Sequence, residues 1–348
     1  MSLKRRDLGA AMLGSLAVLG GLAPRDSRAQ GNSAQGNSAQ GAATQGAGSF
    51  PGTRPVTIVV AWAPGGSTDF VARVLAQALS ATLPGNVVVD NRPGASGTIG
   101  HGSVARARPD GYTLLLGVNS TYAMARHLFP QRGYDDERAF DGIGKVATTP
   151  IFLCVNKQLG VRDIAGFVAK AKAAPRQMSY GSSGAGSSAH LATELFLSMA
   201  GIQVENVTYR GGAPAVQALI ANEVQMAFVD AVTALPLIAS DQIVALGVSS
   251  KERNPLAPNV PTIAESGFPG YECTSDFALL APHGTPAAII QKLHGALVAA
   301  AKDPEFVKRL EQNSVFPAIG SPEQWPAQLA AESRKWGDLI QERGIRLE

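Results

Sequence analysis

Cysteine is almost absent from this chain, which has two cysteines, Cys154 and Cys273, among 348 residues. At most one disulfide can therefore form within the chain. Both cysteines lie in extended apolar segments, Ile151–Val155 and Tyr271–Ser275. A disulfide between neighbouring strands and a pair of buried thiols are both compatible with this pattern, because the sequence does not supply the distance between the two Cα atoms.

Histidine is also scarce, and its five positions do not show the spacing of metal ligands. We therefore expect neither a metal nor another cofactor. The five positions are His101, His127, His190, His283 and His294.

An excess of charge of one sign is lacking in the part of the chain that is expected to fold. The chain has 30 basic and 27 acidic residues, and five of the basic and two of the acidic residues lie within the first 29 positions. The remainder therefore carries 25 residues of each sign. A balanced chain lacks the electrostatic footprint of a nucleic-acid-binding protein, so we expect no nucleic acid partner.

A long apolar run occurs at the N-terminus, where Leu8–Leu22 follows the basic Lys4–Arg6 and precedes the small residues of Ser27–Ala29. This three-part layout is typical of a bacterial export signal, and the run is too short and too rich in glycine to remain as a membrane span. We expect residues 1–29 to direct export to the periplasm, by the twin-arginine or the Sec route, with cleavage near Ala29. Neither cysteine lies near that position, so a soluble protein without a lipid anchor is expected.

The next segment, residues 30–49, has a different composition. Gln-Gly-Asn-Ser-Ala occurs twice in tandem and is followed by more glycine, alanine and glutamine. Such a segment cannot bury enough apolar surface to fold, so it predicts a disordered low-complexity leader. The folded part then begins near Phe50 and spans about 300 residues, enough for two lobes with separate cores.

Strand-like apolar runs alternate with helical patterns over most of this region. Residues 69–83, for example, carry apolar side chains at helical spacing directly after the β-branched run 56–60. Such alternation predicts an α/β fold with parallel-rich sheets flanked by helices. We expect strands at 56–60, 87–90, 113–117, 178–180, 204–209, 226–229 and 244–248, and helices at 69–83, 187–200, 213–220, 235–239, 286–302 and 322–343. The last two helices are expected to pack on the first lobe.

The first strand-to-helix junction, Ala63–Asp69, is rich in glycine and hydroxyl groups. Gly65 and Gly66 let the backbone approach a ligand closely, and the free amides of the following helical turn form an anion site. Asp69 either contacts the ligand or, as we favour, holds the loop by accepting amide hydrogen bonds. Trp62 precedes this loop and is expected to form a wall of the pocket.

A second junction, Gly181–His190, also follows a strand and opens a helix. Its glycines, hydroxyl groups and free amides form a neutral cradle rich in hydrogen-bond donors, which suits a carboxylate. His190 falls in the first helical turn, where the helix dipole disfavours a charged imidazolium. We expect His190 to be a neutral hydrogen-bond donor that orders the loop.

Three further junctions add polar groups, namely Tyr209–Pro214, Phe228–Ala231 and Asn119–Thr121. None of the junctions shows a nucleophile paired with a base, so we expect a binding site and no catalytic residues. An exported α/β hydrolase is the alternative, although the run around Ser183 lacks the last glycine of G-x-S-x-G. The run Gly184–Ala189 also fits the dinucleotide pattern G-x-G-x-x-A, which is a weak signal when it stands alone.

These junctions resemble the Bug, or tripartite tricarboxylate transporter substrate-binding (TctC-like), family from about Phe50 to the C-terminus. Seven ordered blocks carry the resemblance. They are Pro64–Asp69, Asp90–Ala95 with Gly97 and Gly100, Pro109–Leu115, Ser182–Ser187 with His190–Leu191 and Glu194–Phe196, Tyr209–Gly212, Val260–Gly267 and Ala281–Pro286.

The resemblance implies a two-lobed periplasmic binding protein of the type II, Venus flytrap kind, whose chain crosses between the lobes twice. Lobe 1 would comprise residues 50–152 and 276–348, and lobe 2 residues 153–275. The protein would be a monomer that captures a small carboxylate-bearing ligand in the cleft and delivers it to the membrane subunits of a tripartite transporter, or to a sensor. The expected ligand-binding residues are Trp62, Gly65, Gly66, Ser67, Thr68, Asp69, Asn119, Ser120, Ser182, Ser183, Gly184, Ala185, Gly186, Ser187, His190, Tyr209, Gly212, Ala213 and Asp230.

The chain departs from the family pattern at a few positions. Asp276-Phe277 stands where a Trp-Phe pair is common, Trp62 replaces a Phe or Tyr, and the usual Pro-Tyr-Asp…Asp-Phe segment reads Gly133-Tyr-Asp135 and Ala139-Phe140. These changes bear on the size and polarity of the pocket. Trp62 leads to the hypothesis of an aromatic acid as ligand.

Overall fold

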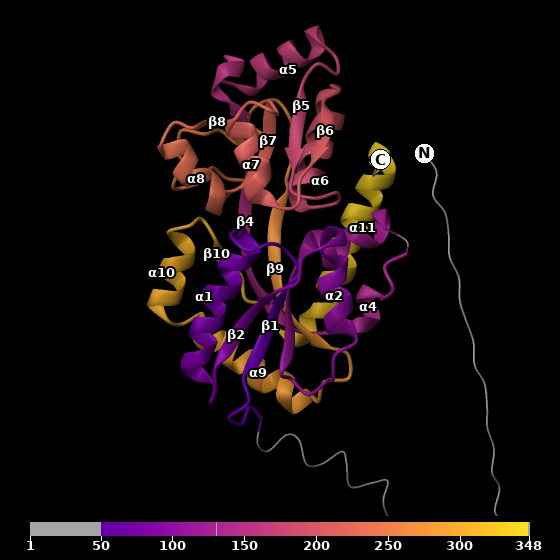
Figure 1. The fold of residues 1–348 in the computed structure, drawn as a ribbon, viewed down its shortest axis with the longest axis vertical. Coiled ribbons are helices and arrows are strands. Elements are labelled where there is room, and N and C mark those ends of the chain that lie inside the picture. Colours follow the sequence, from indigo (N-terminus) through magenta and orange to yellow (C-terminus); the bar gives the residue numbers. More distant parts are fainter. Residues whose placement is uncertain (1–49, 130, 347–348) are drawn as a thin grey trace, which may run out of the picture. The chain divides into compact units, whose positions relative to one another are not determined.

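The computed structural model describes residues 50–129 and 131–346. The expected export signal and leader, residues 1–49, lie outside this part. The predicted alternation of strands and helices is present (Figure 1). The strands are β1 (Val56–Val60), β2 (Val87–Asn91), β3 (Thr113–Val118), β4 (Phe140–Asn156), β5 (Ser179–Ser182), β6 (Glu205–Thr208), β7 (Met226–Asp230), β8 (Ile243–Val248), β9 (Thr274–Pro282) and β10 (Phe316–Pro317). The helices are α1 (Ser67–Thr82), α2 (Thr98–Ala105), α3 (Ala125–Leu128), α4 (Asp136–Ala139), α5 (Ile164–Ala173), α6 (Ser188–Ala200), α7 (Gly212–Ile220), α8 (Ala231–Ala239), α9 (Ala287–Ala300), α10 (Pro304–Glu311) and α11 (Trp325–Arg343).

Lobe 1 is built on β1, which pairs in parallel with β2 and β3. The β-branched residues of Val56–Val60 favour this strand, and all of its valine and isoleucine side chains are buried. Helix α1 covers the sheet because Val71, Val74, Leu75 and Leu79 fall on one helical face and enter the same core.

Lobe 2 is built on β5, which pairs in parallel with β6 and β7. Its core contains aromatic side chains from several elements, among them Tyr180, Phe196 and Phe228. As in lobe 1, the parallel strands carry helices at their carboxyl ends, so β5 leads to α6 and β7 leads to α8.

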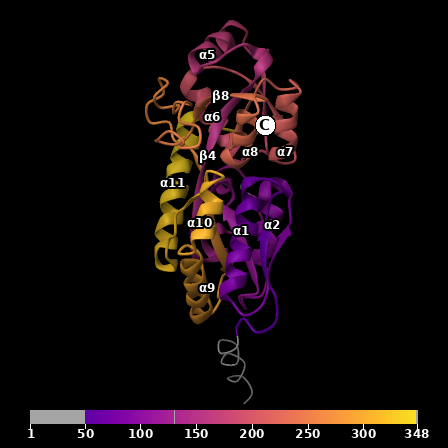
Figure 2. The same ribbon diagram turned by 90° about the vertical axis from the view of Figure 1, so that its left-hand side faces the viewer.

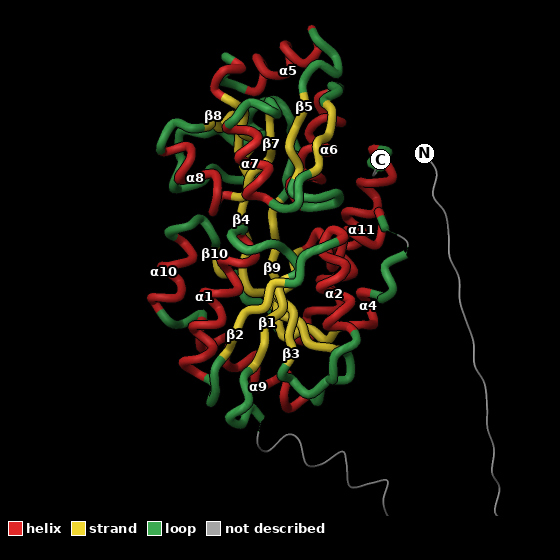
Figure 3. Tube along the Cα trace, in the orientation of Figure 1, coloured by secondary structure: helices red, strands yellow, loops and turns green. Residues whose placement is uncertain are grey.

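Two strands cross between the lobes. Strand β4 pairs with β9 up to Pro150 and with β7 from Ile151 onward, so its first part belongs to one sheet and its last part to the other. Strand β9 returns the chain to lobe 1, where it pairs antiparallel with β3 and β4. The expected parallel arrangement therefore holds for the three-stranded groups around β1 and β5, whereas the crossing strands are antiparallel. Loops gather where the two groups of strands face each other (Figure 3).

The tail does not pack on lobe 1 alone, as the sequence led us to expect. Helix α9 enters the core of lobe 1 through Leu293, and Trp325 at the start of α11 packs with residues of β1, β3 and β9. Trp336 and Ile340, farther along α11, instead lie in the core of lobe 2. Figure 2 shows α11 running beside both lobes. Within the described residues, no helix is both long and apolar enough to cross a membrane.

The two cysteines are free and buried, so the disulfide alternative is not the one present. Cys154 packs with the core residues around Phe152 and Leu219, whereas Cys273 packs with those around Tyr271 and Leu191. The two side chains therefore belong to different apolar clusters.

Candidate ligand-binding site

A cavity of about 70 Å³ lies where residues from both lobes meet. Four helices begin at this cavity, and each contributes residues of its first turn, namely α1, α6, α7 and α8. The helices α1, α7 and α8 have no hydrogen bond from an N-cap side chain. Their first-turn amides therefore keep hydrogen-bonding capacity, and the positive ends of the helix dipoles converge on one space. Such an arrangement attracts an anion.

The loop before α1 is held in place by Asp69. Its carboxylate accepts hydrogen bonds from the amide of Gly65 at 3.1 Å and from Asn91 Nδ2 at 3.0 Å, and it pairs with Arg73 at 2.9 Å. Burial alone would raise the pKa of Asp69, but the hydrogen bonds from Arg73, Gly65 and Asn91 outweigh it and the pKa lies below the ordinary value. Gly65 has φ of +90°, which favours glycine at this turn. Asp69 thus orders the loop and does not line the cavity.

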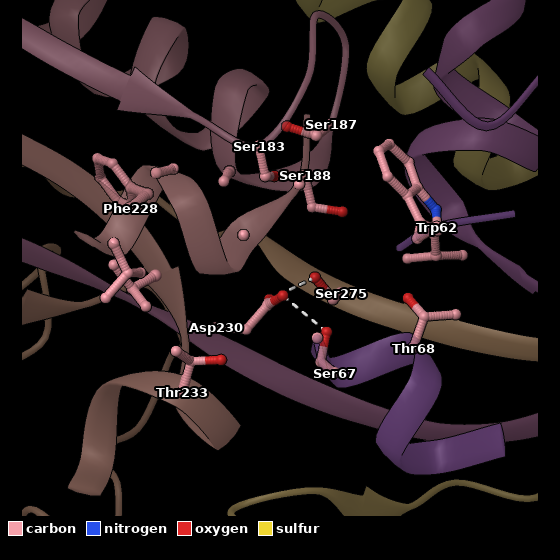
Figure 4. Close-up of a pocket in the computed structure, with 18 of the residues that line it drawn as sticks. Trp62, Ser67, Thr68, Ser183, Ser187, Ser188, Phe228, Asp230, Thr233 and Ser275 are labelled. Carbon is pink, nitrogen blue, oxygen red and sulfur yellow. Dashed lines mark hydrogen bonds between the residues drawn. The ribbon is translucent and has the colours of Figure 1, made fainter. Parts of the chain in front are cut away.

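Asp230 joins the two lobes across the cavity. Its Oδ2 accepts a hydrogen bond of 2.7 Å from the hydroxyl of Ser67, and its Oδ1 accepts one of 2.9 Å from the hydroxyl of Ser275 (Figure 4). Asp230 is the one charged side chain among the described residues that line the cavity. Burial raises the pKa of Asp230, and the hydrogen bonds from Ser67 and Ser275 lower it only in part.

The loop before α6 is ordered by His190, which is buried. Its Nδ1 accepts a hydrogen bond of 2.8 Å from the amide of Gly186, and its own amide donates to Ser187 Oγ at 3.2 Å. Burial lowers the pKa of His190 to about 4, so the imidazole is neutral. The expected ordering role is therefore present, with the correction that the ring acts on the loop as an acceptor and not as a donor.

Two buried donors at the cavity have no hydrogen-bond partner in the described part of the chain. They are the hydroxyl of Ser120, a residue that is 1% exposed, and the indole Nε1 of Trp62. Buried polar groups are nearly always satisfied in folded proteins. Unpaired donors that line a cavity therefore indicate a place where a ligand or water accepts hydrogen bonds.

A second space of about 480 Å³ adjoins the cavity and shares Trp62, Ala63, Ser183 and Gly211 with it. Trp62 lines both spaces, and Figure 4 shows its indole on the side of the cavity opposite Phe228. A Cβ at Gly97 or at Gly184 would lie 3.4 Å from the indole, so glycines of both lobes lie close to this ring. We call this second space the Trp62 compartment.

The structure brings twelve of the nineteen expected site residues to these two spaces. The residues at the cavity are Trp62, Gly66, Ser67, Thr68, Ser120, Ser183, Ser187, Gly212 and Asp230. Those that line the Trp62 compartment without reaching the cavity are Gly184, Ala185 and Tyr209.

Seven expected residues line neither space, and most of them support the loops. Besides Gly65, Asp69, Gly186 and His190, which are described above, Ser182 hydrogen-bonds to Asn206 at 2.9 Å and Asn119 donates to the carbonyl of Thr274 at 3.0 Å. Ala213 is exposed in the first turn of α7. Asp276, the departure from the family pattern noted above, pairs with Lys145 at 3.0 Å and lines neither space.

The polar residues at the cavity that the expected set missed are Ser188, Thr233 and Ser275. Thr233 lies in the first turn of α8, so a search for hydroxyl groups in every first helical turn would have found it. Ser275 reaches the cavity because β9 crosses between the lobes, and no local sequence pattern predicts that placement.

The arrangement matches a known family. A model of the tripartite tricarboxylate transporter family receptor (TctC) matches residues 71–345. The chain belongs to this family.

Solved structures of the family support the fold. Rpa4515 of R. palustris, solved with adipate, is 35% identical with a TM-score of 0.82, and the alignment covers 85% of this chain and 99% of that one. The periplasmic binding protein BugD is 32% identical with a TM-score of 0.81, and the coverage is 85% and 99%. MatC of Rhodopseudomonas palustris, with bound malate, is 30% identical with a TM-score of 0.80, and the coverage is 84% and 100%. The two-lobed α/β fold and the Bug/TctC assignment expected from the sequence are confirmed, and the chain is a solute-binding protein of a receptor family.

Proposed function

We propose that the protein is an exported receptor that binds a small ligand by a carboxylate group in the cavity between the lobes. The convergence of four helix N-termini on one space carries this proposal. The TctC relatives solved with adipate and with malate hold ligands of that class. Residues 50–152 with 276–348 would form one lobe and residues 153–275 the other, with the last turns of α11 packed against the second lobe. Closure of the lobes around the ligand would present it to the membrane subunits of a tripartite transporter.

The helix dipoles alone do not supply the binding free energy of a micromolar ligand. Each N-terminus contributes about 0.3–1 kcal/mol to the binding of an anion, so four contribute about 1–4 kcal/mol. Micromolar affinity corresponds to about 8 kcal/mol. Hydrogen bonds to a charged acceptor, worth about 1.5–3 kcal/mol each, supply the difference. The amides of Ser67 and Ser188 and the unpaired donors of Ser120 and Trp62 are the groups that would make them.

The hydrolase alternative would need a base beside Ser183. The nearest candidate in sequence, His190, lies outside the cavity lining and uses Nδ1 to hold the amide of Gly186. Its Nε2 approaches Asn206 at 3.5 Å and Glu194 at 3.7 Å. These contacts favour a loop-ordering role for His190, and they favour the receptor over the enzyme.

A pair of substitutions at Ser188 tests the proposal. Ser188 is the first residue of α6, where proline is well tolerated, and Ser187 before it already has the extended backbone that proline requires. Ser188→Pro removes the amide donor and keeps the helix, whereas Ser188→Ala removes only the hydroxyl. We expect adipate affinity, measured by calorimetry, to fall about tenfold or more in Ser188→Pro and to change little in Ser188→Ala. Equal affinities in both variants would contradict a carboxylate held by backbone amides.

Delivery to a transporter requires its own measurement. Uptake of a labelled ligand by cells that carry the receptor and its membrane subunits should stop when the receptor is deleted. It should also slow when the receptor carries Ser188→Pro and the labelled ligand is kept dilute. Uptake that continues without the receptor would contradict the transport role and leave the binding role intact.

A further inference from the structure

A further pocket, of about 330 Å³, lies between α11 and the two strands that cross between the lobes. Lys145 of β4 and Asp276 of β9 line it from the strands. Trp325, Leu329 and Glu332 line it from α11, where their spacing places them on one helical face. We call this space the α11 pocket. Its volume falls within the range of about 300–1,000 Å³ that is usual for small-molecule sites.

The α11 pocket is separate from the ligand cavity. Ser275 lines the cavity, whereas Asp276, the next residue of β9, lines the α11 pocket. Successive side chains of a strand point to opposite faces of the sheet, so β9 forms a wall between the two spaces. Among the described residues, none lines both. Asp276 is also the departure from the family pattern noted above, so a residue that the pattern does not contain lines this pocket.

The α11 pocket contains hydrogen-bond donors that an acceptor could use. Trp325 is 5% exposed, and its buried indole Nε1 has no hydrogen-bond partner among the described residues. The ring is fixed by Tyr122, whose centroid lies 5.1 Å away in an edge-to-face contact. The ammonium of Lys335 is 3.9 Å from the carboxylate of Glu272, which also pairs with Lys251 at 3.5 Å. Because buried donors are nearly always satisfied, the unpaired indole beside lysine side chains indicates a negatively charged acceptor on a bound molecule.

Glu332 calls for a positive charge on the same molecule. Its Oε1 accepts hydrogen bonds from two neutral donors, Asn119 Nδ2 at 3.1 Å and Trp336 Nε1 at 2.8 Å. Within the described residues this half-buried carboxylate has no ion pair. The other acidic group of the pocket differs, because Asp276 pairs with Lys145 at 3.0 Å. The charge of Glu332 therefore remains for an ammonium group to neutralise.

We propose that the α11 pocket is a second ligand site, which binds a free amino acid as a zwitterion. The ammonium group would pair with Glu332, and the carboxylate would accept a hydrogen bond from the indole of Trp325 beside a lysine ammonium. Leu329 and the ring of Tyr122 give the pocket apolar surface for the side chain of an apolar amino acid. The inference goes beyond the proposed function, because it assigns a different molecule to a different place.

Leucine and 3-methylbutylamine test the inference, because they share the ammonium group and the branched chain and differ in the carboxylate. We expect calorimetry on the purified protein to show that leucine binds at least about tenfold more tightly than the amine. Glu332→Gln keeps the acceptor for Asn119 and Trp336 and removes the charge, so it should weaken leucine binding at least about tenfold. Glu311→Gln is the control, because it removes an exposed acidic charge outside the pocket and should leave leucine affinity unchanged.

Two adjacent positions of α11 locate the bound leucine. Ala331 and Ala330 are both exposed, but only Ala331 lines the pocket. Ala331→Phe should abolish leucine binding by filling the pocket, whereas Ala330→Phe should leave it unchanged. Ser188→Pro, which alters the ligand cavity, should also leave leucine affinity unchanged. Circular dichroism of each variant checks that it is folded, and the comparison of leucine with the amine needs no variant.

Three results would overturn the inference. They are leucine that does not bind at millimolar concentration, leucine that binds no more tightly than 3-methylbutylamine, and leucine affinity that survives Glu332→Gln or Ala331→Phe. Loss of leucine binding in Ser188→Pro would place the amino acid in the ligand cavity and would overturn the inference as well. The proposed function is tested separately, by the affinity for adipate.

Discussion

The hydroxyl of Ser67 donates a hydrogen bond of 2.7 Å to the carboxylate of Asp230. Ser67 is the first residue of α1 in lobe 1, and Asp230 is the last residue of β7 in lobe 2. The two lobes therefore touch directly at the cavity, and an acidic group lies beside a site that suits an anion. The hydroxyls of Ser67 and Ser275 donate hydrogen bonds to both oxygens of this carboxylate, so these oxygens already have partners within the protein.

The burial of Asp230 predicts how stability depends on pH. Because its pKa is raised above the ordinary 3.8, the folded protein binds this proton more tightly than the unfolded chain does. The corresponding stability is fully present below pH 3.8 and is lost as the pH rises through the raised pKa. Asp230→Asn does not titrate, so its stability relative to the unsubstituted protein should increase from acidic to neutral pH. Urea unfolding of both proteins at a series of pH values measures the difference.

Asp69 provides the opposite case and serves as the control. Its pKa is lowered, so the stability that it contributes is present above the ordinary pKa of 3.8 and is lost as the pH falls through the lowered value. Asp69→Asn should therefore cost about 1–3 kcal/mol at neutral pH, and the loss should shrink in acid. A parallel pH dependence of the two variants would contradict the assignment of opposite environments.

The hydroxyl of Ser120 should contribute to ligand affinity and not to the stability of the fold. Its hydroxyl is buried at the cavity and has no partner within the described residues, so Ser120→Ala removes no hydrogen bond of the folded chain. We expect an unchanged melting temperature and an affinity for adipate that is lower by about three- to tenfold. Thr149→Val is the matched control, because the Thr149 hydroxyl donates a buried hydrogen bond of 2.9 Å to the carbonyl of Ser314. That variant should lose about 1 kcal/mol of stability and keep its affinity. A lower melting temperature with unchanged affinity in Ser120→Ala would show that this hydroxyl stabilises the fold and does not contact the ligand.

Gly184 tests the fit between Trp62 and lobe 2. Its φ is +133°, and a Cβ there would lie 3.4 Å from the indole. Gly184→Ala should therefore destabilise the fold by at least about 1 kcal/mol, and the strain that it places on the loop beside Trp62 should also weaken the binding of adipate and terephthalate. Gly201→Ala adds backbone strain at φ +60° with open space around the new atom, so it should lower stability while leaving affinity unchanged. Calorimetry and thermal unfolding of both variants separate strain beside the site from strain elsewhere, and equal affinities in the two variants would contradict a role of the Gly184 loop in binding.

The thiols of Cys154 and Cys273 should be unreactive in the folded protein. Burial raises the pKa of both Cys154 and Cys273, which disfavours the reactive thiolate. A thiol reagent such as Ellman's should therefore react slowly with the native protein and rapidly with two groups per chain after unfolding without a reductant. Absence of reactive thiols in the unfolded chain would instead indicate the disulfide that the sequence alone allows.

The junction loops were predictable from the sequence because their signals are local. Glycines and hydroxyl residues between a strand and a helix, as at Gly66 and Ser67, identify a helix N-terminus without any knowledge of the rest of the fold. The role of Asp69 depends on Asn91 and Arg73, which the fold brings to it, so the sequence left two alternatives open. Likewise, the pairing of Asp230 with Ser67 and Ser275 joins residues far apart in the chain. Such long-range placement follows from the crossing strands, which no periodic pattern predicts.

Helix α11 has a consequence for motion of the cleft. Trp325 is fixed in the core of lobe 1 and Trp336, about three turns later, in the core of lobe 2. Because one helix is packed in both cores, the lobe closure proposed above would have to bend α11 or withdraw one of the two rings. Trp325 and Trp336 line neither the cavity nor the Trp62 compartment, so they would oppose such a motion from outside the binding site.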